Sequence, residues 1–150
     1  HPITTASQMY HTIMPLAPTQ DIIIMSAAVA DYSCEEIADE KIKKSENYIH
    51  LQLNKNKDIL FELGKIKKEN QILCGFAMET NNLIQNAFEK LKKKNCDMIV
   101  ANHLKTQGAG FQGDTNIVSI ITHKDIKEYG LQSKESLAYE ILNLLINMEE

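Results

Sequence analysis

The sequence predicts an α/β fold with a Rossmann-like, mostly parallel sheet flanked by helices and a C-terminal antiparallel strand pair. Three short apolar runs, Ile22–Met25, Ile72–Phe76 and Asp97–Ala101, are typical of strands that are buried on both faces. Helical periodicity lies between these runs, and strands that alternate with helices indicate βαβ units with parallel strands. No repeat, low-complexity tract or linker divides residues 1–150, so we expect a single domain.

The N-terminal part of the chain predicts a helix before the first strand and a further strand after it. Ser7 can cap the helix, and Pro15 and Pro18 would end it. Beyond the first strand, Ile49–Leu53 alternates apolar and polar side chains. Such alternation is typical of a half-buried strand.

Two helices are expected in the middle of the chain. Asn56 or Asp58 can cap the first, which continues to about Lys68 with apolar residues at helical spacing. Thr80 or Asn81 would start the second. Each helix leads into an apolar run, which is the arrangement that a parallel sheet requires.

The C-terminal part predicts an antiparallel pair of strands and a last helix. Ile117–Thr122 and Ile126–Tyr129 flank a short polar turn. Ser133 can cap the last helix, whose apolar residues fall on one face. The loop Gly108–Asp114 is glycine-rich, but it is a weak signal by itself because no helix follows it.

The composition excludes several classes of protein. The net charge of −4 comes from mixed charges, which argues against a nucleic-acid binder with a basic surface. The three cysteines and five histidines have no ligand spacing, so we expect no protein-held metal site and a reducing cytoplasm. No segment has the roughly 20 apolar residues of a membrane span. The N-terminus also lacks the features of a signal peptide, so we expect a cytoplasmic protein without membrane or nucleic-acid partners.

Three small or polar stretches follow the predicted parallel strands: Ala27–Asp31, Phe76–Asn81 and Ala101–His103. Ligands of open α/β sheets bind at the carboxyl ends of these strands. Asp31 could accept hydrogen bonds from a ribose or a base, or help to hold magnesium, but it could equally bind backbone amides in a turn. Phe76 could stack on a base, although a phenylalanine that closes a buried strand more often belongs to the core.

Two groups of lysines could bind phosphate groups. Lys41–Lys44 contains three lysines that could neutralise a triphosphate, although most lysine runs are solvated loops. Lys90 and Lys94 are four residues apart on one face of a helix, so they could reach the same anion. Their neighbours Lys92 and Lys93 are explained by the favourable position of cations at a helix C-terminus.

Seven motifs in a fixed order make this chain resemble the bacterial phosphopantothenoylcysteine synthetases. The family carries AAVADY, KIKK, NPDI, GFAAET, a lysine-bearing helix, D-x-I-x-A-N and G-F-x-x-D-x-N. The corresponding segments here are Ala27–Tyr32, Lys41–Lys44, Asn56–Ile59, Gly75–Thr80, Lys90–Lys94, Asp97–Asn102 and Gly110–Asn116. Lys57 replaces the family's proline, and Met78 replaces an alanine.

This resemblance implies a ligase that joins 4′-phosphopantothenate to L-cysteine in coenzyme A biosynthesis. CTP would activate the carboxylate as an acyl-cytidylate with loss of pyrophosphate, with magnesium as cofactor, and the cysteine amine would then attack. Lys41 would be the catalytic residue, on a loop that closes over the intermediate, and Ala28 would lie beside the acyl-nucleotide. The implied CTP contacts are Asp31, Lys41, Lys57, Asp58, Ile59, Leu60, Phe76, Lys90 and Lys94.

The resemblance also implies partners and a missing segment. The family forms homodimers, and fusion to or association with a flavin-dependent decarboxylase is an open expectation. The family domain begins with a strand and a glycine- and serine-rich nucleotide-binding turn that this sequence does not match. We therefore expect residues 1–150 to be the C-terminal part of the ligase domain.

Two other classes of function compete with the ligase. The first is a nucleotide-binding or structural module without catalysis. The second is a Rossmann-type oxidoreductase that uses NAD, which is disfavoured because the sequence has no G-x-G-x-x-G fingerprint.

Overall fold

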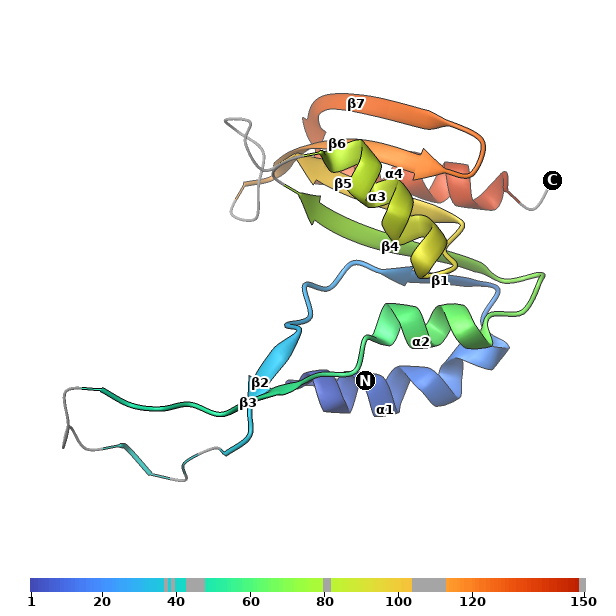
Figure 1. Cartoon of the computed structure of the whole chain (residues 1–150). Coiled ribbons are helices and arrows are strands. Elements are labelled where there is room, and N and C mark those ends of the chain that lie inside the picture. Colours follow the sequence, from blue (N-terminus) through green and yellow to red (C-terminus); the bar gives the residue numbers. More distant parts are fainter. Residues whose placement is uncertain (37, 39, 43–47, 80–81, 104–112, 149–150) are drawn as a thin grey trace.

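The computed structural model describes residues 1–36, 38, 40–42, 48–79, 82–103 and 113–148 (Figure 1). The helices and strands, in chain order, are α1 (Ala6–Leu16), the 3-10 helix η1 (Ala17–Thr19), β1 (Ile22–Met25), β2 (Tyr32–Cys34), β3 (Leu53–Lys55), α2 (Ile59–Ile66), β4 (Ile72–Glu79), α3 (Leu83–Lys93), β5 (Met98–His103), β6 (Thr115–Thr122), β7 (Ile126–Ser133) and α4 (Lys134–Ile146). Five strands form one sheet in the order β1-β4-β5-β6-β7, and β2 and β3 form a separate pair.

The large sheet is parallel on one side and antiparallel on the other. β1 pairs with β4, and β4 with β5, in parallel. β6 runs antiparallel to both β5 and β7. α3 makes the crossover from β4 to β5, as parallel neighbours require. The predicted α/β fold, with its parallel strands and its C-terminal antiparallel pair, is confirmed.

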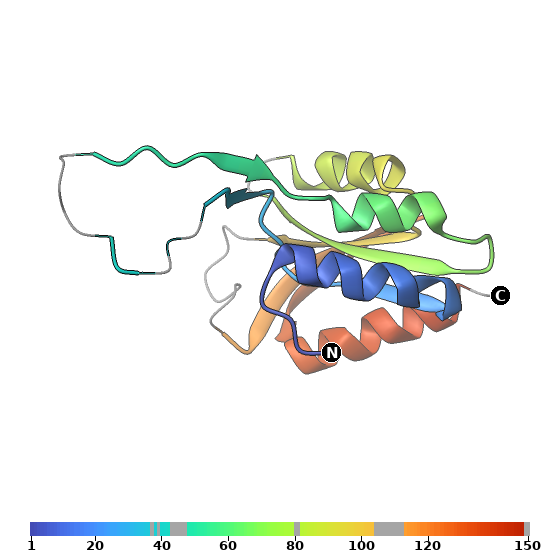
Figure 2. The same ribbon diagram turned by 90° about the horizontal axis from the view of Figure 1, so that it is seen from below.

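Helices cover both faces of the sheet (Figures 1 and 2). The helices α1, α2 and α3 pack on one face, where Leu63 and Leu91 meet Ile99 of β5. The helix α4 packs on the other face, where Leu145 meets the neighbouring residue Val100. Successive residues of β5 therefore enter opposite cores, which follows from the alternation of side chains along a strand. No helix in the described part of the chain is long and apolar enough to span a membrane.

The strand β1 lies at the edge of the sheet, and the predicted burial on both faces is wrong. In the described part of the chain, β1 pairs with β4 on one side only. Ile22 and Ile23 are half-buried, and Ile24 is exposed. An apolar run indicates a strand, but the burial of that strand depends on which elements cover it, and the run does not encode them.

The helix α1 begins and ends at different residues from those predicted. Thr5 caps it in place of Ser7, because the Thr5 hydroxyl accepts a hydrogen bond from the backbone N–H of Gln8. The Gln8 side chain accepts from the Thr5 N–H in return, which completes a capping box. Pro15 lies inside the last turn, and the helix continues to Leu16. A proline so close to the end removes one hydrogen bond without ending the helix.

The strands β2 and β3 begin a ribbon that extends away from the sheet (Figures 1 and 2). Tyr32 pairs with Lys55, and the ladder includes only three residues of each strand. The half-buried strand predicted over Ile49–Leu53 is therefore wrong except at its last residue. The apolar side chains of this segment are exposed because no described layer covers them. We call residues 32–55 the arm.

Four strands are longer than predicted. The strand β6 begins at Thr115 instead of Ile117, and β7 continues to Ser133 instead of Tyr129. The strand β4 continues to Glu79 and β5 to His103, so residues expected in loops belong to the sheet. The helix α3 begins after Asn82, whose φ of 48° is in the left-handed region. The predicted start at Thr80 or Asn81 lies outside the described residues.

The helices α2 and α3 make close contact at Gly64. The Gly64 carbonyl accepts a hydrogen bond of 2.8 Å from Nδ2 of Asn95. A Cβ atom on Gly64 would overlap the carbonyl oxygen of Lys94 and lie 2.8 Å from its carbonyl carbon. Glycine therefore allows the end of α3 to approach α2, which positions the lysines of that helix end.

The three cysteines are free thiols in two different environments. Cys34 is exposed, whereas Cys74 and Cys96 are buried. Burial raises the pKa of each buried thiol to about 12, because a thiolate would lose its hydration. The two buried thiols therefore remain protonated at neutral pH and act as small core residues.

Candidate functional site

A cavity of about 450 Å³ lies beside the carboxyl ends of β1 and β4, on the sheet face that carries α2 and α3. The β1–β2 connection forms one part of its wall. The end of β3 with the segment that follows it, the N-terminus of α2, Phe76 of β4 and the C-terminal end of α3 form other parts. We call it the lysine cavity. The predicted nucleotide contacts that line it are Asp31, Lys57, Asp58, Ile59, Leu60, Phe76, Lys90 and Lys94.

Asn56 holds the β1–β2 connection in place. Its backbone N–H donates to the carbonyl oxygen of Asp31 at 2.8 Å, and its Nδ2 donates to that of Ala30 at 2.9 Å. The Ser33 hydroxyl donates to Oδ1 of Asn56 at 2.9 Å. These bonds fix Asp31 at the cavity wall. The sequence indicated Asn56 as a possible helix cap and as the first residue of a family motif, but not in this role.

The N-terminus of α2 opens into the lysine cavity. Oδ1 of Asp58 accepts a hydrogen bond of 3.0 Å from the backbone N–H of Phe61, so Asp58 caps the helix as predicted. The amides of Ile59 and Leu60 belong to the first turn, where N–H groups have no partner within the helix. Such amides, together with the helix dipole, favour an anion at this end of the cavity.

The lining of the cavity carries more positive than negative charge. Asp31 and Asp58 are its acidic residues, and the basic residues are Lys55, Lys57, Lys90, Lys93 and Lys94. Several ammonium groups that converge on one cavity repel one another less when an anion binds between them. The arrangement therefore suits a ligand with more than one phosphate group.

Lys90 and Lys94 are held in place by contacts within the protein. Nζ of Lys90 donates to the carbonyl oxygen of Phe76 at 2.7 Å. Nζ of Lys94 forms an ion pair with Asp58. Burial lowers the pKa of the Lys94 ammonium, while the charge of Asp31 acts in the opposite direction. Both lysines lie on the same side of α3, as their spacing predicts.

Two lysines of the cavity were missed by the sequence reasoning. Lys93 was explained by its position at the helix end, yet it lines the cavity with Lys90. Their spacing of three residues places them on one side of the helix, and this signal could have identified Lys93. Lys55 lines the cavity from β3. Its position depends on the pairing of the arm, which the sequence did not predict.

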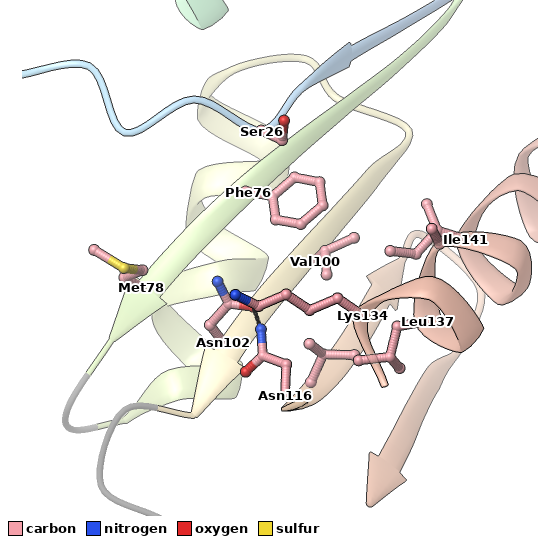
Figure 3. Close-up of a pocket in the computed structure, with 11 residues that line it drawn as sticks. Ser26, Phe76, Met78, Val100, Asn102, Asn116, Lys134, Leu137 and Ile141 are labelled. Atoms are coloured by element: carbon pink, nitrogen blue, oxygen red, sulfur yellow. Dashed lines mark hydrogen bonds between the residues drawn. The ribbon is translucent and has the colours of Figure 1, made fainter. Parts of the chain in front are cut away.

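Phe76 contributes to two cavities on opposite faces of the sheet. Its carbonyl group faces the lysine cavity, where Lys90 binds it. Its ring packs against the core beneath α4 and lines a second cavity of about 400 Å³ (Figure 3). There, Nδ2 of Asn116 donates to Oδ1 of Asn102 at 3.0 Å. A ligand in the lysine cavity would therefore meet the backbone of Phe76 and not the face of its ring.

Two predicted site residues lie apart from the lysine cavity. Lys41 is exposed on the arm and is not part of the cavity lining. Ala28 lines a neighbouring cavity of about 640 Å³ between α1 and the β1–β2 connection, whereas Ala27 lines the lysine cavity. The two cavities share Val29 and Ala30 in their walls. Lys43, Lys44 and Gly110–Gln112 lie outside the described residues.

The described residues contain no group of three or more histidine, cysteine, aspartate or glutamate side chains that could hold a metal ion. In the lysine cavity, Asp58 is already bound to Lys94 and to the amide of Phe61. Asp31 is the remaining carboxylate of the lining. Magnesium commonly combines one or two carboxylates with substrate phosphates, so this cavity fits an ion that arrives with its ligand.

The fold and the cavity define an α/β domain with a lysine-rich cavity beside the carboxyl ends of its parallel strands, where ligands of open α/β sheets bind. The chain belongs to the family described as the DNA/pantothenate metabolism flavoprotein C-terminal domain, whose model matches residues 1–148.

Relatives and a solved structure agree with this assignment. The chain is 44% identical over 144 residues to the coenzyme A biosynthesis bifunctional protein CoaBC of Bacillus subtilis, covering 94% of this chain and 35% of the relative. It is 40% identical over 147 residues to a cysteine/cysteine sulfinic acid decarboxylase of an unknown prokaryotic organism, covering 97% of this chain and 41% of the relative. A crystal structure of the C-terminal domain of CoaBC matches with a TM-score of 0.75 and 36% identity, covering 97% of this chain and 65% of that one. The chain thus spans well under half of the length of these two curated relatives.

Proposed function

We propose that this chain is part of a phosphopantothenate–cysteine ligase of coenzyme A biosynthesis. The observation that carries the proposal is the lysine cavity, which gathers all of the positions that the family motifs assign to CTP except Lys41. The similarity to CoaBC over 94% of the chain supports the same reaction class.

The proposed reaction has two steps. A carboxylate oxygen of 4′-phosphopantothenate attacks the α-phosphorus of CTP, and the bond to the bridging oxygen breaks as pyrophosphate leaves. The cysteine amine then attacks the acyl carbon, loses a proton as the amide bond forms, and CMP departs. Lys90, Lys93 and Lys94, with the first-turn amides of α2, would hold the triphosphate and stabilise the charge on pyrophosphate.

The neighbouring cavity and the cofactor complete the proposal. The cavity that Ala28 lines would hold the acid, because it shares a wall with the lysine cavity. Magnesium would enter with CTP, near Asp31, and would neutralise phosphate charge when bound. Fusion to or association with a flavin-dependent decarboxylase is part of the proposal, and the flavoprotein family description supports it.

The test uses the full-length protein that contains this chain, with CTP, magnesium and 4′-phosphopantothenate. We expect pyrophosphate release that depends on the acid, and an amide product that forms only when L-cysteine is added. A calorimetric titration with CTP and with ATP accompanies the assay and establishes which nucleotide binds.

A module that binds a nucleotide without catalysis is the second candidate, and the position of Lys41 favours it. The side chain of Lys41 is exposed and apart from the lysine cavity. CTP binding without release of pyrophosphate in the full-length protein would support this candidate and contradict the ligase.

The arm is the proposed contact between two copies of the chain. The large apolar side chains of its described residues are more than half exposed, which is costly in water unless a partner covers them; they are Tyr32, Ile42, Tyr48, Ile49, Leu51 and Leu53. Ile49→Glu/Leu51→Glu is expected to raise the dissociation constant of a homodimer at least about tenfold. Analytical ultracentrifugation would measure this change. Leu131→Glu, on β7, is the control, and an unchanged constant in the arm variant would exclude the arm as the interface.

A further inference from the structure

Among the lysines that line the cavity, Lys57 stands at a position where this chain departs from the family motif. The motif has proline at this position, so a contact made there by the family pattern comes from the backbone. Here the position carries a long cationic side chain, and that side chain lines the lysine cavity. The substitution therefore adds a charge at the place where an anion is expected.

The Lys57 ammonium is held by an aromatic ring. Its Nζ lies 4.3 Å from the centroid of the Tyr10 ring, within the range of a cation–π contact. Tyr10 belongs to α1 and packs, half-buried, against the core that α1 shares with α2 and α3. The ring is thereby fixed, and it restricts a side chain that would otherwise sample many rotamers.

Lys90 and Lys94 have oxygen partners in addition to any ring. Lys94 lies 5.4 Å from the centroid of the Phe61 ring but is also paired with the carboxylate of Asp58, and Lys90 donates to the carbonyl of Phe76. An aromatic ring attracts a cation but carries no opposite net charge, so it orients the Lys57 ammonium without neutralising it. Lys57 directly precedes Asp58, the N-cap of α2, and the first-turn amides of that helix themselves attract an anion.

We propose that Lys57 is a phosphate-binding residue and that Tyr10 is its positioning residue. The ligand is the polyphosphate part of a nucleoside triphosphate in the lysine cavity. Lys57 binds phosphate oxygens beside the N-terminus of α2, and Tyr10 holds its ammonium near that place before the ligand arrives. This inference rests on the proposed function, because it assumes that the lysine cavity binds the triphosphate.

The test is calorimetric titration of the full-length protein with CTP, CMP and pyrophosphate. Lys57→Met keeps the stem of the side chain and removes the charge, and we expect its dissociation constant for CTP to rise about five- to tenfold. The dissociation constant for pyrophosphate should rise by a similar factor. That for CMP should rise by less than about twofold, because CMP lacks the outer phosphates. Lys127→Met, which removes an exposed lysine on β7, is the matched control and should bind all three as the parent does.

Variants of Tyr10 test the positioning role. Tyr10→Phe keeps the ring and should bind CTP as the parent does. Tyr10→Leu removes the ring, and its dissociation constant for CTP should rise about two- to threefold. In the Lys57→Met background, Tyr10→Leu should have no further effect, because the two residues act through one contact. Thermal unfolding of each variant confirms that the protein remains folded.

The outcomes separate the inference from the proposed function. The phosphate contact would be overturned if Lys57→Met left the affinity for CTP unchanged, or if it lowered the affinities for CTP and CMP equally. If Tyr10→Leu lowered the affinity for CTP further in the Lys57→Met background, the positioning role of Tyr10 would be overturned. If the parent protein binds neither CTP nor pyrophosphate, the proposed function itself fails.

Discussion

Gly64→Ala is expected to lower the free energy of unfolding by about 3 kcal/mol, at the upper end of the range for overpacking. The added methyl group would overlap the backbone carbonyl of Lys94, and no side-chain rotation relieves that overlap. The two helices would have to separate, with loss of the bond between Asn95 and the Gly64 carbonyl. Urea denaturation of parent and variant measures the difference.

Gly130→Ala is the matched control for this change. A Cβ atom on Gly130 would have no neighbour within 4 Å, so its stability should stay within about 0.5 kcal/mol of the parent. If Gly64→Ala unfolds at the same urea concentration as Gly130→Ala, the close contact of α2 with α3 does not hold in solution. The same contact places Lys94 opposite Asp58, so a folded Gly64→Ala protein should also bind CTP more weakly.

Lys41→Ala in the full-length protein is expected to lower kcat by at least about 100-fold, as removal of a direct charge contact with a transition state typically does. Lys41 is exposed on the arm, and the proposed role requires the arm to bring it to the acyl-nucleotide. Pyrophosphate release under saturating CTP and 4′-phosphopantothenate measures this rate.

The control for Lys41→Ala is Lys127→Ala, which removes an exposed charge far from the arm in the sequence. A structural role for Lys41 would weaken folding or CTP binding, so thermal unfolding and CTP titration are measured with the rate. Near-parental turnover of Lys41→Ala would remove Lys41 from the catalytic machinery.

The sequence predicted the large sheet well because its signals are local. Apolar runs predicted β1, β4 and β5, and two segments that flank a short polar turn predicted β6 and β7. Capping residues Asp58 and Ser133 were identified because their side chains act within one helical turn. In contrast, the exposure of Ile24 depends on which strand lies beside β1, and that is a property of the whole sheet.

The candidate site was predicted only in part, because the sequence signals are local. The motifs named residues whose side chains or backbone line one cavity, but they did not indicate in which direction each side chain points. Phe76 turns its ring to the α4 face, which follows from its position along the strand and not from residue type, and its carbonyl accepts a hydrogen bond from Lys90. Lys55 reaches the cavity because β3 pairs with β2, and neither strand had been recognised at those residues.

The burial of Cys74 and Cys96 makes Cys34 the accessible thiol of this chain. With pKa values of about 12, the two buried thiols form almost no thiolate at pH 7 to 8, and thiolate is the species that reacts with maleimides. A fluorophore would therefore attach selectively at Cys34, at the base of the arm and in the wall of the cavity that Ala28 lines. Its emission would report a ligand that enters this cavity, without any engineered cysteine.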